Sequence, residues 1–149
     1  MFRKLASLSL MVILVSAVAT PALAQQSGDS LYKRLGGYDA IAAVTDDFIG
    51  RLVADPQLSK FFVGFSDDSK KRIRQHVVDF LCQATGGPCI YTGRDMKTAH
   101  AGSHISEADW NAGIKDLSAT LDKFKVPDRE RTDVMNALAP LKSDIVSVH

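Results

Sequence analysis

Apolar residues at helical spacing, separated by glycine and proline breaks, constrain the fold of this chain more than any other feature. The clearest case is the segment 38–54, where apolar side chains recur every three or four positions: Ile41, Val44, Phe48 and Leu52. This spacing places the side chains on one face of a helix. No segment alternates polar and apolar residues convincingly, so a sheet is not supported. The sequence therefore predicts an all-α fold.

Capping residues and helix breakers set the predicted boundaries. Ser66 and Ser106 stand before acidic first turns, as helix N-caps do. Glycine pairs and prolines end or start other segments, and Pro140 should bend the last helix. The predicted helices are 31–35, 38–54, 56–62, 67–84, 94–100, 107–124 and 127–145. A glycine- and proline-rich loop, 86–94, joins two of them.

The segment 1–24 has the order of parts of a secretory signal peptide. Arg3 and Lys4 precede an uncharged, mostly apolar stretch from Leu5 to Ala19, and an Ala-x-Ala site ends at Ala24. The alternative is a membrane anchor, although the apolar run is shorter than the ~20 residues that a span needs. We therefore expect a signal peptide over 1–24, one domain over 25–149, and a periplasmic or secreted protein without a membrane segment after cleavage.

Charge and motif content exclude several classes of function. The net charge of +1 among 149 residues gives no electrostatic footprint for nucleic acid. Phosphate-binding loops, dinucleotide fingerprints, nucleophile elbows and structural-zinc spacings do not occur. No catalytic residue is predicted. The sequence contains no Cys-x-x-Cys-His, so covalent c-type haem attachment is not indicated. Cys82 and Cys89 are interpreted either as a disulfide, which an exported protein can keep, or as buried thiols.

Four histidines are available as ligands: His76, His100, His104 and His149. On the wheel of the helix 67–84, His76 lies at the edge of an apolar stripe formed by Ile73, Val77, Phe80 and Ala84. It could face an apolar pocket or be half-exposed among charged neighbours. His100 ends a short helix, and a surface histidine would look the same. We interpret His104 as a loop residue and His149 as the chain end.

One long stretch resembles the group I truncated haemoglobins. It runs from Phe80 through Gly86-Gly87-Pro88 to Tyr91-Thr92-Gly93 and Met96-Lys97-Thr98-Ala99-His100. The order Gly-Gly, Tyr-x-Gly and Met-Lys-x-x-His is specific to that group. Leu31 to Gly37 is similar to the family's opening helix, and Ala139-Pro140-Leu141 with Asp144 is similar to its last. The resemblance covers about Leu31 to Val146 and, with the leader, suggests an exported, proteobacterial-type member.

The resemblance implies a two-over-two helical sandwich around haem b, with His100 as the proximal iron ligand. It also implies an apolar pocket lined by Phe48, Phe62, Phe80, Met96 and Leu138. Arg72, Tyr91 and Arg94 become candidates to meet the haem propionates.

The distal side departs from the best-known family pattern. Ile49 stands where many members carry tyrosine, Val77 where many carry glutamine, and Ile73 is apolar as well. Hydrogen-bond donors to bound oxygen are therefore missing from three places, which lowers the expectation of tight oxygen binding and of efficient NO dioxygenation. His76 matches a position where some cyanobacterial and algal members carry an iron-binding histidine, so we expect a bis-histidyl haem in the unliganded state.

The expected function is reversible binding of O2 or another diatomic gas such as NO or CO. Alternatives are electron transfer with a redox partner protein, redox sensing, and weak NO dioxygenase or peroxidase activity. A cofactor-free interaction module on the same scaffold is a further alternative, because a fold does not dictate function.

Overall fold

The computed structural model describes residues 28–148, and each helix in that range overlaps a segment that the sequence predicts to be helical. The predicted signal peptide and His149 lie outside the described residues. The elements are α1 (Leu31–Arg34), α2 (Gly37–Ala54), the 3-10 helix η1 (Ser59–Phe62), α3 (Asp67–Ala84), α4 (Met96–His100), α5 (Glu107–Lys123), α6 (Asp128–Leu138), η2 (Ala139–Leu141) and α7 (Lys142–Ile145). Within residues 28–148 no strand forms, which confirms the all-α prediction.

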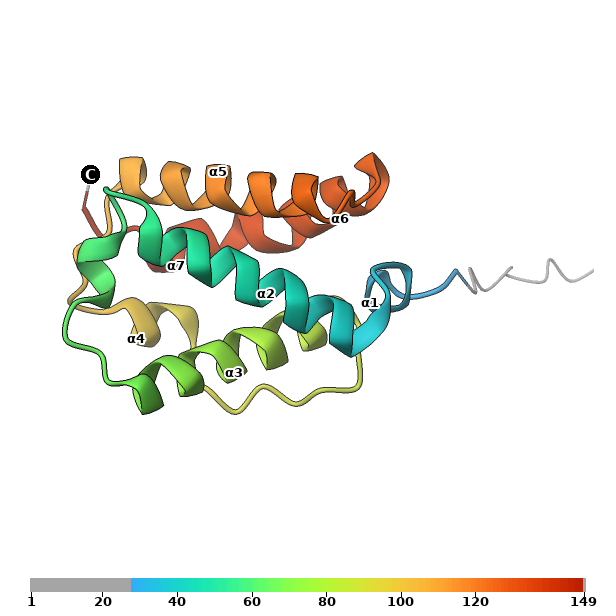
Figure 1. Cartoon of the computed structure of the whole chain (residues 1–149), viewed down its shortest axis with the longest axis horizontal. Helices are drawn as coiled ribbons and strands as arrows, with labels where there is room; N and C mark the ends of the chain where they lie inside the picture. The colour runs from blue at the N-terminus through green and yellow to red at the C-terminus, as the bar shows by residue number, and fades with distance from the viewer. Residues whose placement is uncertain (1–27, 149) are drawn as a thin grey trace, which may run out of the picture.

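Two helix pairs make up the body of the molecule (Figure 1). Helix α2 packs on α3 in one layer and on α5 of the other layer, so it joins the two. Helix α1 contacts both α2 and α6, so it also links the two layers. The short helix α4 packs on α7, away from the axis of α2. The arrangement is the two-over-two helical sandwich that the sequence resemblance implies.

Two clusters of buried side chains hold these layers together. Ile41, Val78 and Cys82 form the first cluster, between α2 and α3. Leu117, Leu121 and Val134 form the second, between α5 and α6. Phe48 and Leu138, both predicted to line a cofactor pocket, pack against the second cluster. Their apolar side chains therefore contribute to the sandwich itself.

Helix α3 buries a different face from the one expected. Val78 and Cys82 are completely buried, whereas Ile73, Val77 and Phe80 of the predicted stripe are only half-buried. Both faces are apolar, so a helical wheel alone could not rank them. The Val78–Cys82 face packs on α2, and the predicted stripe points elsewhere.

Several predicted boundaries are wrong by a few residues. The helix expected from Pro56 is a turn followed by η1. The Asp55 carboxylate accepts hydrogen bonds from the amides of Gln57 at 2.7 Å and Leu58 at 3.1 Å. Such bonds from an aspartate to nearby backbone amides stabilise a local turn. The segment expected from Arg94 becomes helical only at Met96, and the opening helix ends at Arg34 rather than Leu35.

Other boundary predictions are confirmed by the caps. Ser66 caps α3, and Ser106 with Asp109 forms a complete capping box on α5. One boundary differs by a residue: Pro127, expected as the first residue of the last helix, is the N-cap of α6. Pro140 interrupts the last helix, which continues as η2 and α7. None of the helices within residues 28–148 is long and apolar enough to cross a membrane.

Candidate functional site

Helix α4 is a short, capped helix that ends at His100. Asp95 caps the helix: its carboxylate accepts hydrogen bonds from the amide (2.9 Å) and the hydroxyl (2.8 Å) of Thr98. These hydrogen bonds hold the pKa of Asp95 below its ordinary value, so a negative charge stays at the positive end of the helix dipole. The cap fixes a helix of only five residues, which ends at His100.

The ring of His100 has one nitrogen committed and one free. Its Nδ1 lies 2.8 Å from the carbonyl oxygen of Met96. A carbonyl oxygen can only accept, so Nδ1 carries the proton and donates it. In the neutral imidazole this tautomer leaves a lone pair on Nε2, the atom with which such a ring can ligate a metal. His100 as a whole is half-buried.

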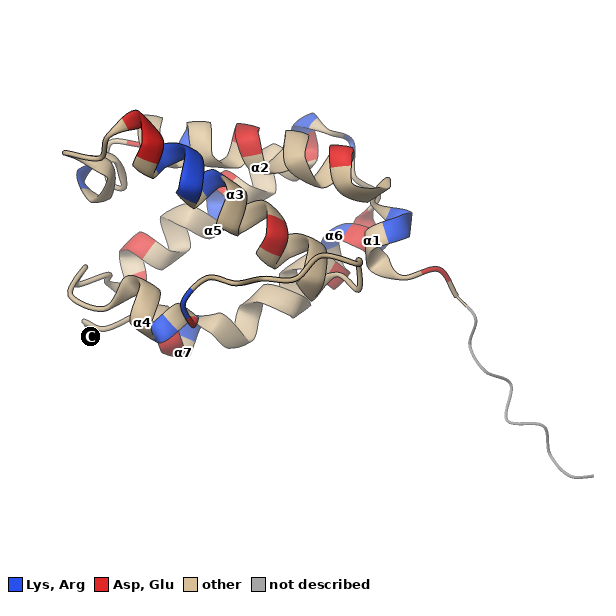
Figure 2. Cartoon of the chain, turned by 90° about the horizontal axis from the view of Figure 1, so that it is seen from below, with Lys and Arg blue, Asp and Glu red and all other residues tan. Residues whose placement is uncertain are grey.

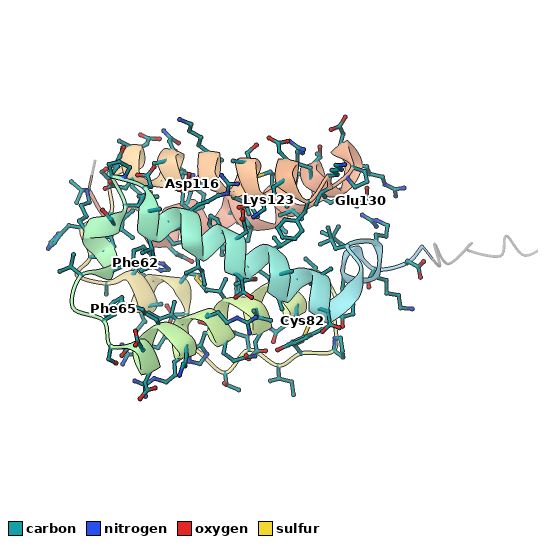
Figure 3. All side chains as sticks on the ribbon, viewed as in Figure 1. Phe62, Phe65, Cys82, Asp116, Lys123 and Glu130 are labelled. Atoms are coloured by element: carbon teal, nitrogen blue, oxygen red, sulfur yellow. A yellow bond between two sulfur atoms is a disulfide. The ribbon has the colours of Figure 1, made fainter. Side chains whose placement is uncertain are left out.

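Apolar side chains that the sequence predicts to contact haem lie on α2, η1, α3 and α4. Ile73, Val77 and Phe80 of α3 and Met96 of α4 are all half-buried, as are Phe62 of η1 and Ile49 of α2. The Phe62 and Phe65 rings meet edge to face, with ring centroids 6.4 Å apart, beside the start of α3 (Figure 3). None of Ile49, Ile73 and Val77 can donate a side-chain hydrogen bond, so the predicted distal side is apolar.

His76 lies on α3 against the aromatic ring of a residue from the following loop. Its ring meets that of Tyr91 edge to face, with centroids 6.0 Å apart, and Tyr91 also meets Phe80 at 5.3 Å. His76 and Phe80 are four residues apart and therefore share one face of α3. The His76 side chain is otherwise exposed. The structure thus joins three predicted site residues, His76, Phe80 and Tyr91, in one aromatic group.

The predicted propionate partners differ in whether their polar groups are already paired. Tyr91 donates its hydroxyl proton to the carbonyl oxygen of Arg94 at 2.6 Å. Burial, followed by the charge of Asp95, raises the pKa of Tyr91, so the phenol keeps that proton. Arg72 and Arg94 are both exposed, and within residues 28–148 neither guanidinium pairs with a carboxylate. The two guanidinium groups are therefore available to a carboxylate, whereas the Tyr91 hydroxyl proton is already donated to a carbonyl oxygen.

A disulfide fastens the segment that carries Tyr91. Cys82, at the C-terminal end of α3, is bonded to Cys89, with 5.7 Å between their Cα atoms (Figure 3). One of the two interpretations of these cysteines is therefore confirmed. The loop runs from there alongside α3 to α4 without regular secondary structure, as Figure 2 shows.

Two surface hollows elsewhere on the molecule have no part in this site. One, of about 480 Å³, is lined by the η2–α7 segment and Glu107. The other, of about 540 Å³, lies between α5 and α6 beside Trp110 and Met135. Neither is lined by any residue predicted to contact haem. Among residues 28–148 no group of three or more histidine, cysteine or carboxylate side chains could hold a metal ion.

Sequence reasoning missed three contributions to the site. Gln83 accepts a hydrogen bond from the Tyr91 amide at 2.7 Å, Asp95 caps α4, and Met96, predicted only as an apolar contact, also supplies a backbone carbonyl. The spacing Asp95-x-x-Thr98 is a readable cap signal. Nothing in the sequence pattern pairs Gln83 with a backbone amide eight residues away.

Comparison with known proteins gives a consistent result. The family profile described as a bacterial-like globin matches residues 30–147. The group 1 truncated hemoglobin GlbN of Mycolicibacterium paratuberculosis is 35% identical over 118 residues, covering 79% of this chain and 85% of the relative. GlbN of Nostoc commune is 38% identical over 118 residues, covering 79% and 98%. The crystal structure of truncated hemoglobin from Tetrahymena pyriformis in the Fe(III) form superposes with a TM-score of 0.73 at 28% identity, covering 80% of this chain and 99% of that one.

Proposed function

This chain belongs to the bacterial-like globins, as a relative of the group 1 truncated haemoglobins, and from that premise we propose that His100 is the proximal ligand of a b-type haem. The observation that carries the proposal is the hydrogen bond from His100 Nδ1 to the Met96 carbonyl. In the neutral imidazole this hydrogen bond leaves the Nε2 lone pair free to bind iron, at the end of a short, capped helix. When bound, haem supplies an iron that takes a diatomic gas as its ligand.

The surrounding side chains fit such a group. Ile73, Val77, Phe80 and Met96 offer half-buried apolar contacts to a flat hydrophobic ring, and they come from the two elements that also carry the histidines. Arg72 and Arg94 offer exposed cations to carboxylates at its edge. Helices α3 and α4 and the loop between them therefore carry all three kinds of group that would bind haem: imidazole nitrogens for the iron, apolar side chains for the ring, and arginines for the propionates.

The proximal assignment is tested by titrating haemin into purified protein. His100→Ala should weaken haemin binding and lose the spectrum of the bis-histidyl protein, because no other histidine stands on α4 and His76 alone cannot supply both axial ligands. His104→Asn is the matched control, since His104 is exposed, lies four residues further on, and has a positive φ that asparagine tolerates. Pigment binding by the His100→Ala variant with an unchanged spectrum would contradict the assignment.

On the distal side we assign His76 as the second nitrogen ligand when no gas is bound. It shares the α3 face of Phe80, and its neighbours Ile73 and Val77 offer no competing polar group. His76→Ala should turn a low-spin ferric absorption spectrum high-spin. A ferric spectrum that is the same before and after the substitution rules out this role for His76.

Reversible binding of O2, NO or CO is the function that this arrangement supports best. The apolar side chains of Ile49, Ile73 and Val77 give bound oxygen no hydrogen bond, so rapid O2 release and slow NO dioxygenation are expected. A bis-histidyl site also favours electron transfer as the second candidate function, because axial ligands set the redox potential. Stopped-flow O2 release, and the reaction of the oxygenated protein with NO, distinguish the two.

We place the protein outside the cytoplasm. The leader sequence over 1–24 motivates this assignment, and the Cys82–Cys89 disulfide supports it because disulfides persist in oxidising compartments. Expression of the whole chain in a bacterial host should yield an exported product that begins at Gln25. Retention of Met1 by the purified protein would contradict it.

A further inference from the structure

The Cys82–Cys89 disulfide fixes the start of the loop between α3 and α4. It closes a tight turn in which the Gly87 amide donates to the Cys82 carbonyl at 2.8 Å. A Cβ atom at Gly87 would lie 2.5 Å from the Tyr32 ring and 2.7 Å from the Cys82 sulfur, so only glycine fits there. Cys82 itself is completely buried against Ile41 and Val78. The loop is therefore anchored in the α2–α3 core at this end.

Tyr91 is held at several points just beyond this anchor. Its amide donates to Gln83, the residue after the disulfide cysteine Cys82, and its hydroxyl donates to the Arg94 carbonyl. Its ring lies so close to Gly93 that a Cβ there would stand 2.3 Å from the phenol oxygen. With one hydrogen bond at each end of the residue and a glycine under the ring, Tyr91 has little freedom to move.

The ring of Tyr91 is in turn the aromatic contact of His76. The centroids of the two rings are 6.0 Å apart and their planes meet at 82°, which describes an edge-to-face pair. Phe80, on the same helix face, meets Tyr91 at a centroid distance of 5.3 Å. Aromatic pairs favour this geometry. His76 is otherwise exposed and would sample several side-chain rotamers without this contact. Tyr91 therefore limits where the His76 imidazole can be.

We propose that Tyr91, fastened by the Cys82–Cys89 disulfide and by Gln83, is a positioning residue that holds His76 on the Phe80 side of α3 and so favours its bond to iron. This inference rests on the proposed function of His76. It makes the disulfide part of the control of the distal ligand, although neither cysteine contacts the histidine. Loss of either the Tyr91 ring or the disulfide should weaken the binding of His76 to iron.

The test compares variants of the haem-loaded protein. Tyr91→Leu should lower the equilibrium constant for His76 binding to iron by about twofold to tenfold, the range expected for one aromatic pair, and should raise the high-spin ferric fraction accordingly. Tyr91→Phe, which keeps the ring, should restore most of the low-spin fraction. Tyr38→Leu is the matched control: the Tyr38 hydroxyl accepts a hydrogen bond from Gln75, next to His76, without contacting the His76 ring.

The covalent anchor is tested in the same preparation. Reduction of the disulfide should reproduce the Tyr91→Leu shift and accelerate hydrogen exchange across residues 86–95, whereas a Cys82→Ala/Cys89→Ala variant should no longer respond to the reductant. If His76→Ala changes the spectrum but Tyr91→Leu and reduction do not, the positioning role is wrong and the His76 assignment stands. If His76→Ala changes nothing, both are wrong, while haem binding through His100 is unaffected.

Discussion

The α2–α5–α6 region and the α3–loop–α4 region of this globin are held together by different means. In the first, long helices meet over completely or nearly completely buried residues such as Leu121 and Thr120. In the second, α3 buries Val78 and Cys82 against α2, but the irregular loop and the five-residue helix α4 that follow it are fastened by a disulfide and one tyrosine ring. The comparison teaches that stability and the candidate site reside largely in different parts of the molecule.

Charge reinforces the first region. Asp47 of α2 accepts hydrogen bonds from Lys123 and Thr120 of α5 and from Arg51 of its own helix (Figure 3 labels Lys123). The Lys123 ammonium first, and then the Arg51 guanidinium, hold the pKa of Asp47 well below its ordinary value. At the other end of α5, Asp109 joins Lys60 and Gln57 to the capping box. Among the described residues, neither arrangement has a counterpart between α3 and α4.

The largest expected effect comes from opening the core of the first region. Leu121→Ala should lower the free energy of unfolding by about 2–5 kcal/mol, because it removes buried contacts and leaves a cavity. Ile73→Ala, on the half-buried face of α3, should cost clearly less in the haem-free protein and should weaken haem binding instead. Urea denaturation and haemin titration measure the two quantities. Equal losses of stability would contradict the division into a stabilising region and a site region.

Cutting the disulfide should have an intermediate effect on stability. The chain-entropy model for so short a loop gives a loss of about 2.5 kcal/mol on reduction. The loss should appear as a lower urea midpoint in the wild-type protein after reduction, with no such shift in a Cys82→Ala/Cys89→Ala variant treated in the same way. An unchanged midpoint would mean that the loop is held without its covalent anchor.

The smallest effect is a pH dependence that arises in the first region. Hydrogen bonds from Ser106, followed by those from Lys60 and Gln57, hold the pKa of Asp109 well below its ordinary value of 3.8. A carboxyl group whose pKa is lower in the folded state stabilises the fold above its unfolded pKa, and this contribution is lost as the pH falls below about 4. Asp109→Asn should be less stable at pH 7 and should lose less stability between pH 4 and pH 2. Parallel curves for the two proteins would show that Asp109 does not contribute.

How much the sequence predicts also differs between the two regions. Capping residues and helical spacing predicted α5 to within one residue at its C-terminal end, because Ser106 and Asp109 act locally and Leu117 and Leu121 share one face. The all-α class and the interruption at Pro140 follow from equally local rules. The motif around His100 indicated the proximal candidate by family resemblance, and the structure adds the Met96 hydrogen bond that defines its free nitrogen.

The remaining features depend on contacts between residues that sequence rules do not connect. Which apolar face of α3 is buried depends on where α2 lies, so Val78 and Cys82 could not be ranked above Ile73 and Val77 in advance. The packing of Tyr91 on His76 depends on the path of the loop, and that path depends on a disulfide for which spacing alone left two interpretations. Tertiary geometry therefore decides the details of the distal side.

The central claim is that the Nε2 lone pair of His100 binds the haem iron. The most direct measurement is resonance Raman spectroscopy of the ferrous, gas-free protein in a His76→Ala background, where the second proposed ligand cannot contribute. The His100→Gly/His76→Ala variant, with and without added imidazole, is compared with His76→Ala alone. The iron–histidine stretching band should be absent from the double variant and return as an iron–imidazole band when imidazole fills the space of the deleted ring. A band that persists in the double variant without imidazole would show that another residue holds the iron.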